Sequence, residues 1–286
     1  MAPRKIPTVP QRALAGALER HRTAAGLSPK DAAARLEWSE TKIWRIETAR
    51  VTVSPGDVRE LARVYGLDAE ATEALVQLAR QAKRTGWWKG MSQVLPAGFS
   101  VHLELESTAR AIRTYEAQWV PGLWQTEDYA RAILRASSLT RTPEQVERQV
   151  QTRMLRQQIL TRTDTPPPVM WAILDEAVIR RMVGGREVMR GQLQRLHDLS
   201  GQQDTTLQIL PFTVGAHIAD YGSFALFEPS DPAFPVTAST DRPGGNLIED
   251  DPEDIQRYTT MFDHLRASSL SPAASQTLIG ETMSLL

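Results

Sequence analysis

The most informative segment of the sequence is Leu27 to Glu47, LSPKDAAARLEWSETKIWRIE. Ser28 is a favoured N-cap residue, Pro29 follows at the first helical position, and Asp31 completes a capping-box spacing. This pattern predicts a short helix. A second N-cap candidate, Ser39, comes so soon after it that the next short helix must cross the first steeply. Two short helices across so tight a turn form a helix-turn-helix unit, whose second helix enters the major groove of DNA.

The same stretch resembles the phage-repressor and Cro-like helix-turn-helix family. The matching core positions are Leu27, Ala32, Ala33, Leu36, Trp38, Ile43 and Ile46. The resemblance implies a structural ion pair between Arg22 and Glu47. Pro29 departs from the family because it replaces a polar residue. Glu37 and Ala49 stand where glycine is common, and at Glu37 the family's glycine turns the chain with positive φ, so this turn is expected to be strained or redrawn.

Eight residues of this unit are candidates for DNA contact. They are Ser28, Ser39, Glu40, Thr41, Lys42, Trp44, Arg45 and Arg50. Arg45 and Thr41 can read base edges, because arginine bonds guanine in a bidentate way and threonine can meet a thymine methyl. The two serine caps and the other two basic residues suit phosphates, which set the register on DNA. Glu40 repels phosphate but can accept from cytosine, and Trp44 either contacts DNA or packs against the following helix.

The charge distribution supports this placement. The chain of 286 residues has a formal net charge of −1 and is long enough for about two domains. Residues 1–50 carry ten Lys and Arg against five acidic residues, whereas residues 201–286 carry three against twelve. The basic end holds the motif, as contact with phosphates requires. The acidic end is either a partner surface or a solvated face.

Catalytic chemistry is poorly represented. There is no cysteine, which excludes disulfides and thiolate metal sites, and the five histidines lack the H-E-x-x-H spacing. A phosphate-binding G-x-x-x-x-G-K is also missing. We therefore expect no enzymatic activity, cofactor or metal. No run is long enough for a membrane span and no signal core is found, so we expect a cytoplasmic, nucleoid-associated protein without membrane contact.

The first domain is expected to be mainly α and to span residues 1–83. Residues 54–57, S-P-G-D, repeat the cap, proline and carboxylate pattern and begin a fourth helix; a fifth follows. Residues 84–106 read as an aromatic-rich linker. Trp87 and Trp88 are expected to dock between the domains or in a dimer interface, because large apolar rings are unfavourable in water.

Residues 107–286 are expected to form a mixed α+β regulatory domain, helical over 107–163 and α/β over 165–286. Apolar residues recur at helical spacing from Leu103 to Ala117, and Thr142-Pro143 caps a later helix. The strand candidates are Val169 to Leu174, Leu207 to Leu210, Ser223 to Phe227 and Val236 to Thr240.

Three segments of this second half carry a further resemblance. They are VPGLWQTEDYA (120–130), LDEAVIRRMVGG (174–185), and QILPFTVGAH (208–217) with GSFALF (222–227). They look like the C-terminal domain of the actinobacterial antitoxin-like transcriptional regulators. That resemblance implies a regulator with an N-terminal helix-turn-helix, encoded beside a small partner protein.

Four large aromatic residues cluster around the Pro121-Gly122 turn: Tyr115, Trp119, Trp124 and Tyr129. They are either core residues or the lining of a groove for a partner or small ligand, since aromatic rings offer much contact area with few rotors.

The leading hypothesis is a sequence-specific DNA-binding transcriptional regulator whose C-terminal domain mediates dimerisation and partner or ligand control. Its expected partners are double-stranded DNA, a second copy of the chain, a small protein encoded nearby and a small-molecule effector. The alternative is an antitoxin-like module that sequesters the small protein and autoregulates its own operon.

Overall fold

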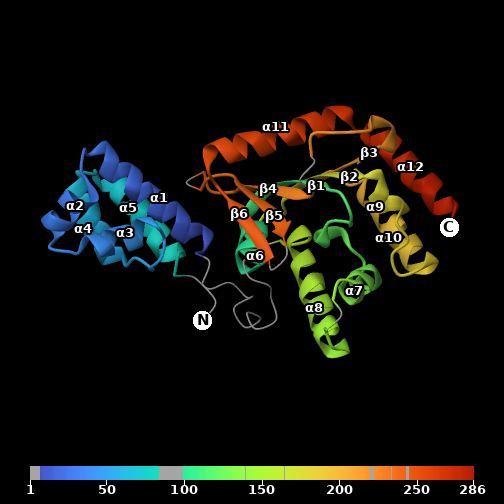
Figure 1. The fold of residues 1–286 in the computed structure, drawn as a ribbon, viewed down its shortest axis with the longest axis horizontal. Coiled ribbons are helices and arrows are strands. Elements are labelled where there is room, and N and C mark those ends of the chain that lie inside the picture. The colour runs from blue at the N-terminus through green and yellow to red at the C-terminus, as the bar shows by residue number, and fades with distance from the viewer. Residues whose placement is uncertain are drawn as a thin grey trace. The chain divides into compact units, whose positions relative to one another are not determined.

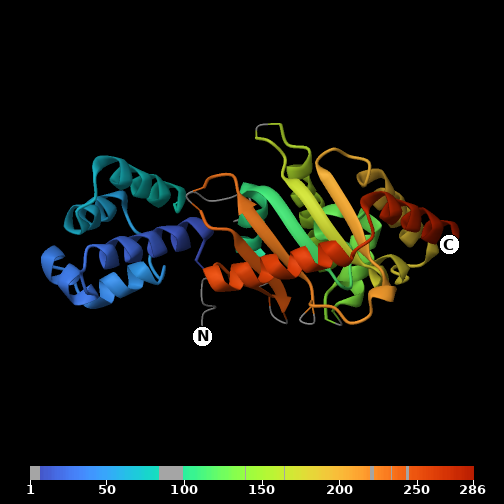
Figure 2. The same cartoon turned by 90° about the horizontal axis from the view of Figure 1, so that it is seen from above.

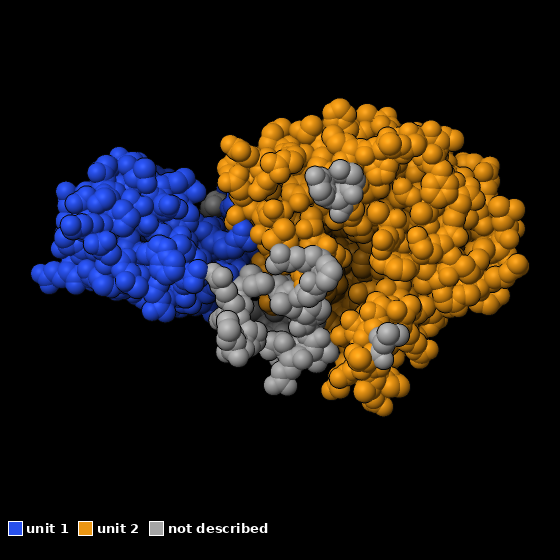
Figure 3. All heavy atoms as spheres, viewed as in Figure 1, with its two compact units in different colours: residues 1–90, 231–235 blue, residues 91–230, 236–286 orange. Residues whose placement is uncertain are grey.

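A computed structural model describes residues 7–83, 99–138, 140–163, 165–219, 222–232, 234–242 and 245–286. The chain divides into two compact units (Figure 3). The N-terminal unit comprises Met1–Gly90 with Asp231–Pro235, and the C-terminal unit comprises Met91–Ser230 with Val236–Leu286. The linker tryptophans, Trp87 and Trp88, lie outside the described residues.

The N-terminal unit is mainly α, as predicted. Its helices are α1 (Val9–Ala24), α2 (Pro29–Leu36), α3 (Glu40–Glu47), α4 (Pro55–Tyr65) and α5 (Ala69–Gln81). The predicted N-caps are confirmed. Ser28 Oγ accepts from the backbone N–H of Asp31 at 3.1 Å, and Ser39 Oγ accepts from that of Lys42 at 3.2 Å. Each cap satisfies a donor that the helix start would leave unpaired, which fixes where α2 and α3 begin.

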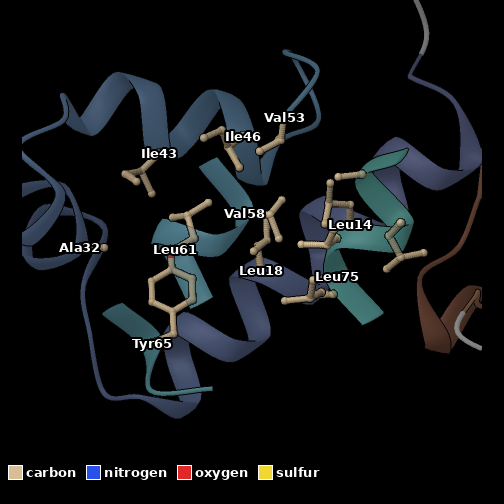
Figure 4. Packing of buried hydrophobic residues seen from close by; sticks show 14 of the residues in the cluster. Leu14, Leu18, Ala32, Ile43, Ile46, Val53, Val58, Leu61, Tyr65 and Leu75 are labelled. Carbon is tan, nitrogen blue, oxygen red and sulfur yellow. The ribbon is translucent and has the colours of Figure 1, made fainter. Parts of the chain in front are cut away.

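The core of this unit gathers apolar side chains from all five helices (Figure 4). Ile43 and Ile46 of α3 and Val58 of α4 are buried, with at most 2% of each exposed. Each such side chain contributes roughly 1.5–3 kcal/mol by leaving water. Ala32 and Ala33 of α2 are also buried, and their small size lets α2 and α3 approach closely. Burial of this apolar stripe leaves the opposite side of α3 facing outward.

The turn between α2 and α3 adopts the predicted strained geometry. Glu37 has φ 55° and ψ 35°, in the left-handed region, and Ala49 after α3 has φ 52°. A residue with a Cβ pays about 1–2 kcal/mol in this region. The turn is closed by the backbone N–H of Trp38, which donates to the carbonyl of Ala33 at 2.9 Å. Packing on either side therefore imposes a conformation that the local sequence disfavours.

A buried ion pair joins α1 to the end of α3, as the family resemblance implied. Arg22 donates from Nε to Glu47 Oε1 at 2.7 Å and from Nη2 to Oε2 at 3.0 Å. Its Nη1 also donates to the carbonyl of Leu27 at 2.7 Å. The Arg22 and Glu47 side chains are only 9% and 8% exposed, and the bond to Glu47 raises the pKa of Arg22. One guanidinium thus fixes the position of α3 against α1.

The C-terminal unit is a mixed α+β fold, as predicted. Its strands are β1 (Ala109–Glu116), β2 (Val169–Asp175), β3 (Thr205–Leu210), β4 (Phe224–Pro229), β5 (Thr237–Arg242) and β6 (Gly245–Glu249). They form one sheet in the order β3-β2-β1-β4-β5-β6. β1, β2 and β3 run parallel, while β4, β5 and β6 are joined by antiparallel pairing.

Helices cover both faces of this sheet. They are α6 (Phe99–Thr108), α7 (Glu127–Ala136), α8 (Pro143–Arg156), α9 (Glu176–Arg180), α10 (Arg186–Leu199), α11 (Pro252–Ser268) and α12 (Pro272–Ser284). Short 3-10 turns lie at Gly122–Trp124, Gln157–Leu160 and Phe212–Val214. α11 crosses one face, and α6 and α8 lie on the other (Figures 1 and 2). No helix in the described ranges is both long and apolar enough to cross a membrane.

The prediction that residues 107–163 are helical is wrong at its start, because Ala109–Glu116 forms β1. The apolar residues there fit helical spacing, yet the strand lies between β2 and β4 and buries side chains toward both faces. A strand in the centre of a sheet is covered on both faces, so its sequence lacks the alternation of apolar and polar residues that identifies an edge or half-exposed strand. β6 was not predicted, and the last part of the predicted linker, residues 99–106, belongs to α6.

Replacing Arg22 with alanine is expected to unfold the N-terminal unit at a markedly lower temperature. The substitution strands the Glu47 carboxylate without its partner, and breaking a buried pair costs about 3–5 kcal/mol, or more than roughly 10 °C in Tm for a domain of this size. Scanning calorimetry measures the change. Arg63→Ala is the matched control, since the Arg63–Glu60 pair is exposed and its loss should shift Tm by no more than a few degrees. Equal effects of the two variants would contradict a structural role for the buried pair.

Candidate nucleic-acid interface

The outward side of α3 presents most of the predicted DNA-contacting residues. Glu40, Thr41, Trp44 and Arg45 are all exposed, while Ile43 and Ile46 point into the core. The separation follows from the helical period, because residues one or two positions from Ile43 or Ile46 fall on other sides of the helix. Beside Trp44, the exposed side carries the guanidinium of Arg45 and the hydroxyl of Thr41, which are groups that can bond base edges.

Thr41 and Arg45 lie one helical turn apart, beside a hollow of about 360 Å³. The lining of this hollow also includes Ser39, Val51 and Thr52. The wall after α3 therefore comes from the segment that leads to α4. Arg45 and Thr41 line the same open space, where an acceptor-bearing base edge fits the chemistry of a guanidinium and a hydroxyl.

Lys42 is held within the unit. Its Nζ lies 2.9 Å from Asp57 Oδ1 and 3.2 Å from the centroid of the Trp38 ring. Burial alone would raise the pKa of Asp57, but hydrogen bonds from Ser54 and Lys42 outweigh it and lower the pKa. Asp57 thus offsets part of the Lys42 charge. The sequence did not identify these partners. Asp57 lies fifteen residues further along the chain, in α4, and Trp38 lies in the turn before α3.

Trp44 is exposed, with 48% of its surface accessible, so the alternative of packing against α4 is wrong. Ile43 and Ile46 occupy the side of α3 that meets the core, and Trp44 points away from it. The guanidinium carbon of Arg50 lies 4.6 Å from the centroid of the Trp44 ring. A cation held over an exposed indole gives a flat surface with positive charge, which suits contact with a sugar-phosphate backbone.

The two serine caps occupy the N-terminal ends of α2 and α3. Both Ser28 and Ser39 are exposed. Helix N-terminal N–H groups and the helix dipole favour anions, so each end is a suitable phosphate contact. Each end also carries a carboxylate in its first turn, Asp31 in α2 and Glu40 in α3, and Asp31 accepts from Ser28.

The aromatic cluster of the C-terminal unit is mainly core. Tyr115, Trp124 and Tyr129 each have 0% of their surface exposed. The Tyr129 hydroxyl accepts from the backbone N–H of Val120 at 3.3 Å, whereas the indole Nε1 of Trp124 meets no acceptor among the described residues. Trp119 is only partly buried and lines a cavity of about 260 Å³. The core alternative is therefore confirmed for Tyr115, Trp124 and Tyr129. The fourth aromatic residue, Trp119, lines a cavity instead.

The comparisons with known proteins agree with this division. Residues 13–75 match a helix-turn-helix domain, the class of domain that binds DNA. Residues 99–281, more than half of the chain, match the family described as "Domain of unknown function (DUF5753)". The chain therefore belongs to the DUF5753 family and carries a helix-turn-helix domain at its N-terminal end. No curated protein and no solved structure matches the chain.

Replacing Trp124 with alanine should lower the Tm of the C-terminal unit by roughly 10 °C. Large-to-small core changes of this kind cost about 3–5 kcal/mol, and a unit of this size loses about 2–4 °C for each kcal/mol. Trp124→Phe should lose much less, because the remaining ring keeps most of the apolar contact and removes an unpaired donor. Calorimetry compares the two variants with Trp44→Ala, whose exposed ring should hardly affect Tm. A normal Tm for Trp124→Ala would contradict the core assignment.

Proposed function

We propose that this protein is a sequence-specific DNA-binding transcriptional regulator. Its α3 enters the major groove, with Arg45 and Thr41 reading base edges. The serine caps, Lys42 and the Arg50–Trp44 pair contact the backbone. The proposal assigns no catalytic activity to the chain.

The observation that carries the proposal is the outward side of α3. The core-facing residues of α3 are buried. The N-cap of α3 and the turn before this helix are those of a helix-turn-helix unit. Arg45 and Thr41 remain exposed beside an open hollow, and neither is used by the core. A positively charged, exposed residue on a recognition helix is best explained by contact with DNA.

We further propose that the protein binds DNA as a homodimer. α3 has only eight residues, so one copy can reach few base pairs. Two copies on half-sites about 10–10.5 bp apart, or multiples of this, would double the contacts and reach the affinity of specific regulators. The C-terminal unit is then the part available for dimerisation and for control by a partner or a ligand.

The antitoxin-like alternative rests on the sequence resemblance of the second half. In that case a small basic protein encoded nearby would bind the acidic C-terminal region, and DNA binding would autoregulate the pair. Co-purification from the native cell, followed by gel retardation with and without the captured protein, separates the two hypotheses.

Arg45→Ala should weaken binding to the operator by roughly 1–3 kcal/mol while leaving non-specific binding nearly unchanged. The lost contact is a bidentate one to a base, which only the correct sequence offers. Gel retardation on an operator selected from random DNA measures the change, with Arg63→Ala as the exposed control on α4.

Lys42→Ala serves as the comparison variant, and it should weaken all DNA sequences alike because a phosphate contact carries no sequence information. Normal retardation by both Arg45→Ala and Lys42→Ala would contradict the assignment of α3 as the reading helix.

Footprinting should reveal two protected half-sites related by a dyad, and light scattering should give two chains per operator. Both results follow from the symmetry of a helix-turn-helix dimer on DNA. A single asymmetric footprint with one bound chain would contradict the dimer.

A further inference from the structure

A cavity of about 260 Å³ lies in the C-terminal unit against the sheet face opposite α11. The helical side of its wall comes from α6, α8 and the Gly122–Trp124 turn. On the sheet side, β1 presents Thr114 and Glu116, which alternate along the strand and share one face. The sheet register puts Asp241 of β5 opposite Asn246 of β6, and both also line the cavity. Polar side chains from three strands thus converge on one space.

Part of the cavity wall is a closed ion-pair network. Arg156 donates from Nε to Glu106 Oε2 at 2.9 Å and from Nη2 to Oε1 at 2.5 Å. His102 Nε2 lies 3.1 Å from the same Oε1. Burial alone would raise the pKa of Glu106, but Arg156 and His102 outweigh it and lower the pKa to about 2. These charges satisfy one another and need no ligand.

Three other charged groups in the cavity are not matched in this way. Glu116 accepts from the hydroxyl of Thr114 at 3.0 Å, and Asp241 accepts from the amide of Asn246 at 2.6 Å. Arg153 Nη1 donates to the neutral side-chain oxygen of Gln125 at 2.7 Å. Within the described part of the chain, none of the three lies at ion-pair distance from an opposite charge. The cavity therefore holds two carboxyl groups and a guanidinium that are hydrogen-bonded to neutral side chains, although the charge of Asp241 also acts on Arg153 from beyond ion-pair distance.

Burial makes Glu116 and Arg153 poorly suited to an empty cavity, whereas Asp241 is exposed. Burial is the main cause that raises the pKa of Glu116 to about 8, and Asp241 adds repulsion. Burial, with the nearby Arg156, lowers the pKa of Arg153 to about 10, and the opposing effect of Asp241 and Glu106 is too small to offset it. An opposite charge placed beside either group would reverse these shifts, because it favours the charged form. The cavity is thus complementary to a molecule with one positive and one negative group.

The rest of the lining limits the size and character of that molecule. Trp119, Phe227, Ile133 and Met170 supply an apolar part of the wall. The volume is below the roughly 300–1,000 Å³ of sites for drug-sized ligands. A compact molecule with a short apolar side chain fits both limits.

We propose that this cavity binds an α-amino acid with an apolar side chain, its ammonium at Glu116 and Asp241 and its carboxylate at Arg153. The apolar side chain lies against Trp119 and Phe227. This assignment deepens the ligand control that the proposed function gives to the C-terminal unit, and it rests on that proposal for its regulatory role. The binding itself does not depend on DNA.

Isothermal titration of the full chain, without DNA, tests the assignment. The probes are L-valine, L-leucine, L-isoleucine, L-methionine and L-phenylalanine. At least one should bind, and its analogues that lack the amine or the carboxylate should each bind about tenfold or more weakly, because a charge-assisted hydrogen bond is worth about 1.5–3 kcal/mol. Absence of binding by all five would overturn the proposal, as would equal affinity of an uncharged analogue.

Two variants locate the site. Glu116→Gln and Arg153→Gln should each weaken the best probe about tenfold or more, whereas Arg148→Gln, an exposed change on the same helix as Arg153, should not. Melting curves verify that each variant is folded. If Arg153→Gln fails to fold, Glu116→Gln still decides, because it replaces a carboxyl by a group of nearly the same shape. Unchanged affinity in a folded Glu116→Gln protein would overturn the assignment.

Proton release provides an independent readout. The titratable and charged groups around Glu116 are Asp241, Arg153, Arg156, Glu106, His102, Tyr115 and Tyr129. Since the pKa of Glu116 is raised to about 8, the Glu116 side chain is protonated in most molecules at pH 7. It must ionise to receive the ammonium. Affinity should therefore fall as the pH is lowered below about 8, and titration in two buffers should reveal a released proton. Glu116→Gln should lose this release. A wild-type protein that binds without releasing a proton would overturn the placement of the ammonium.

The two proposals fail separately. A protein that retards its operator but binds none of the probes overturns only the amino-acid site. One that binds a probe but no DNA overturns the DNA-binding function and leaves the site in place.

Discussion

Arg22 is the residue on which the geometry of the N-terminal unit depends. Its guanidinium reaches the end of α3 through Glu47 and the start of the helix-turn-helix stretch through the carbonyl of Leu27. A short helix has little stability of its own, because nucleation is costly. The eight residues of α3 keep their orientation because this buried clamp and the Ile43–Ile46 stripe hold both its end and its inner side. The outward side of α3 is therefore rigid without being packed.

The two faces of the sheet in the C-terminal unit carry different kinds of side chain. The face beneath α11 is apolar, with Tyr115, Leu226 and Phe262 in one buried cluster. The other face carries Thr114, Glu116 and Asp241 into the cavity. Alternation along β1 places Tyr115 on the first face and its neighbours on the second. One side of the sheet thus packs in an apolar core, while the other presents polar side chains to the cavity.

Local chemistry in the sequence was enough to place the helices of the N-terminal unit. Ser28, Ser39 and Ser54 are caps in the structure because each satisfies a backbone donor nearby in the chain. β1 could not be recognised in the same way, since its residues pack on both sides against strands more than fifty residues away. The cavity could not be predicted from the sequence either. Glu116 and Arg153 come from separate elements, and only the folded sheet and α8 bring them to one space.

The left-handed residues around α3 restrict how this domain can diverge. At Glu37 and Ala49 a glycine would relieve steric strain, so that substitution remains open. Valine, isoleucine or threonine would be excluded, because a branched Cβ is a severe outlier at positive φ. A search pattern that demands glycine at the turn would overlook a helix-turn-helix unit of this kind. The buried positions and the serine caps are the more dependable signature of such a domain.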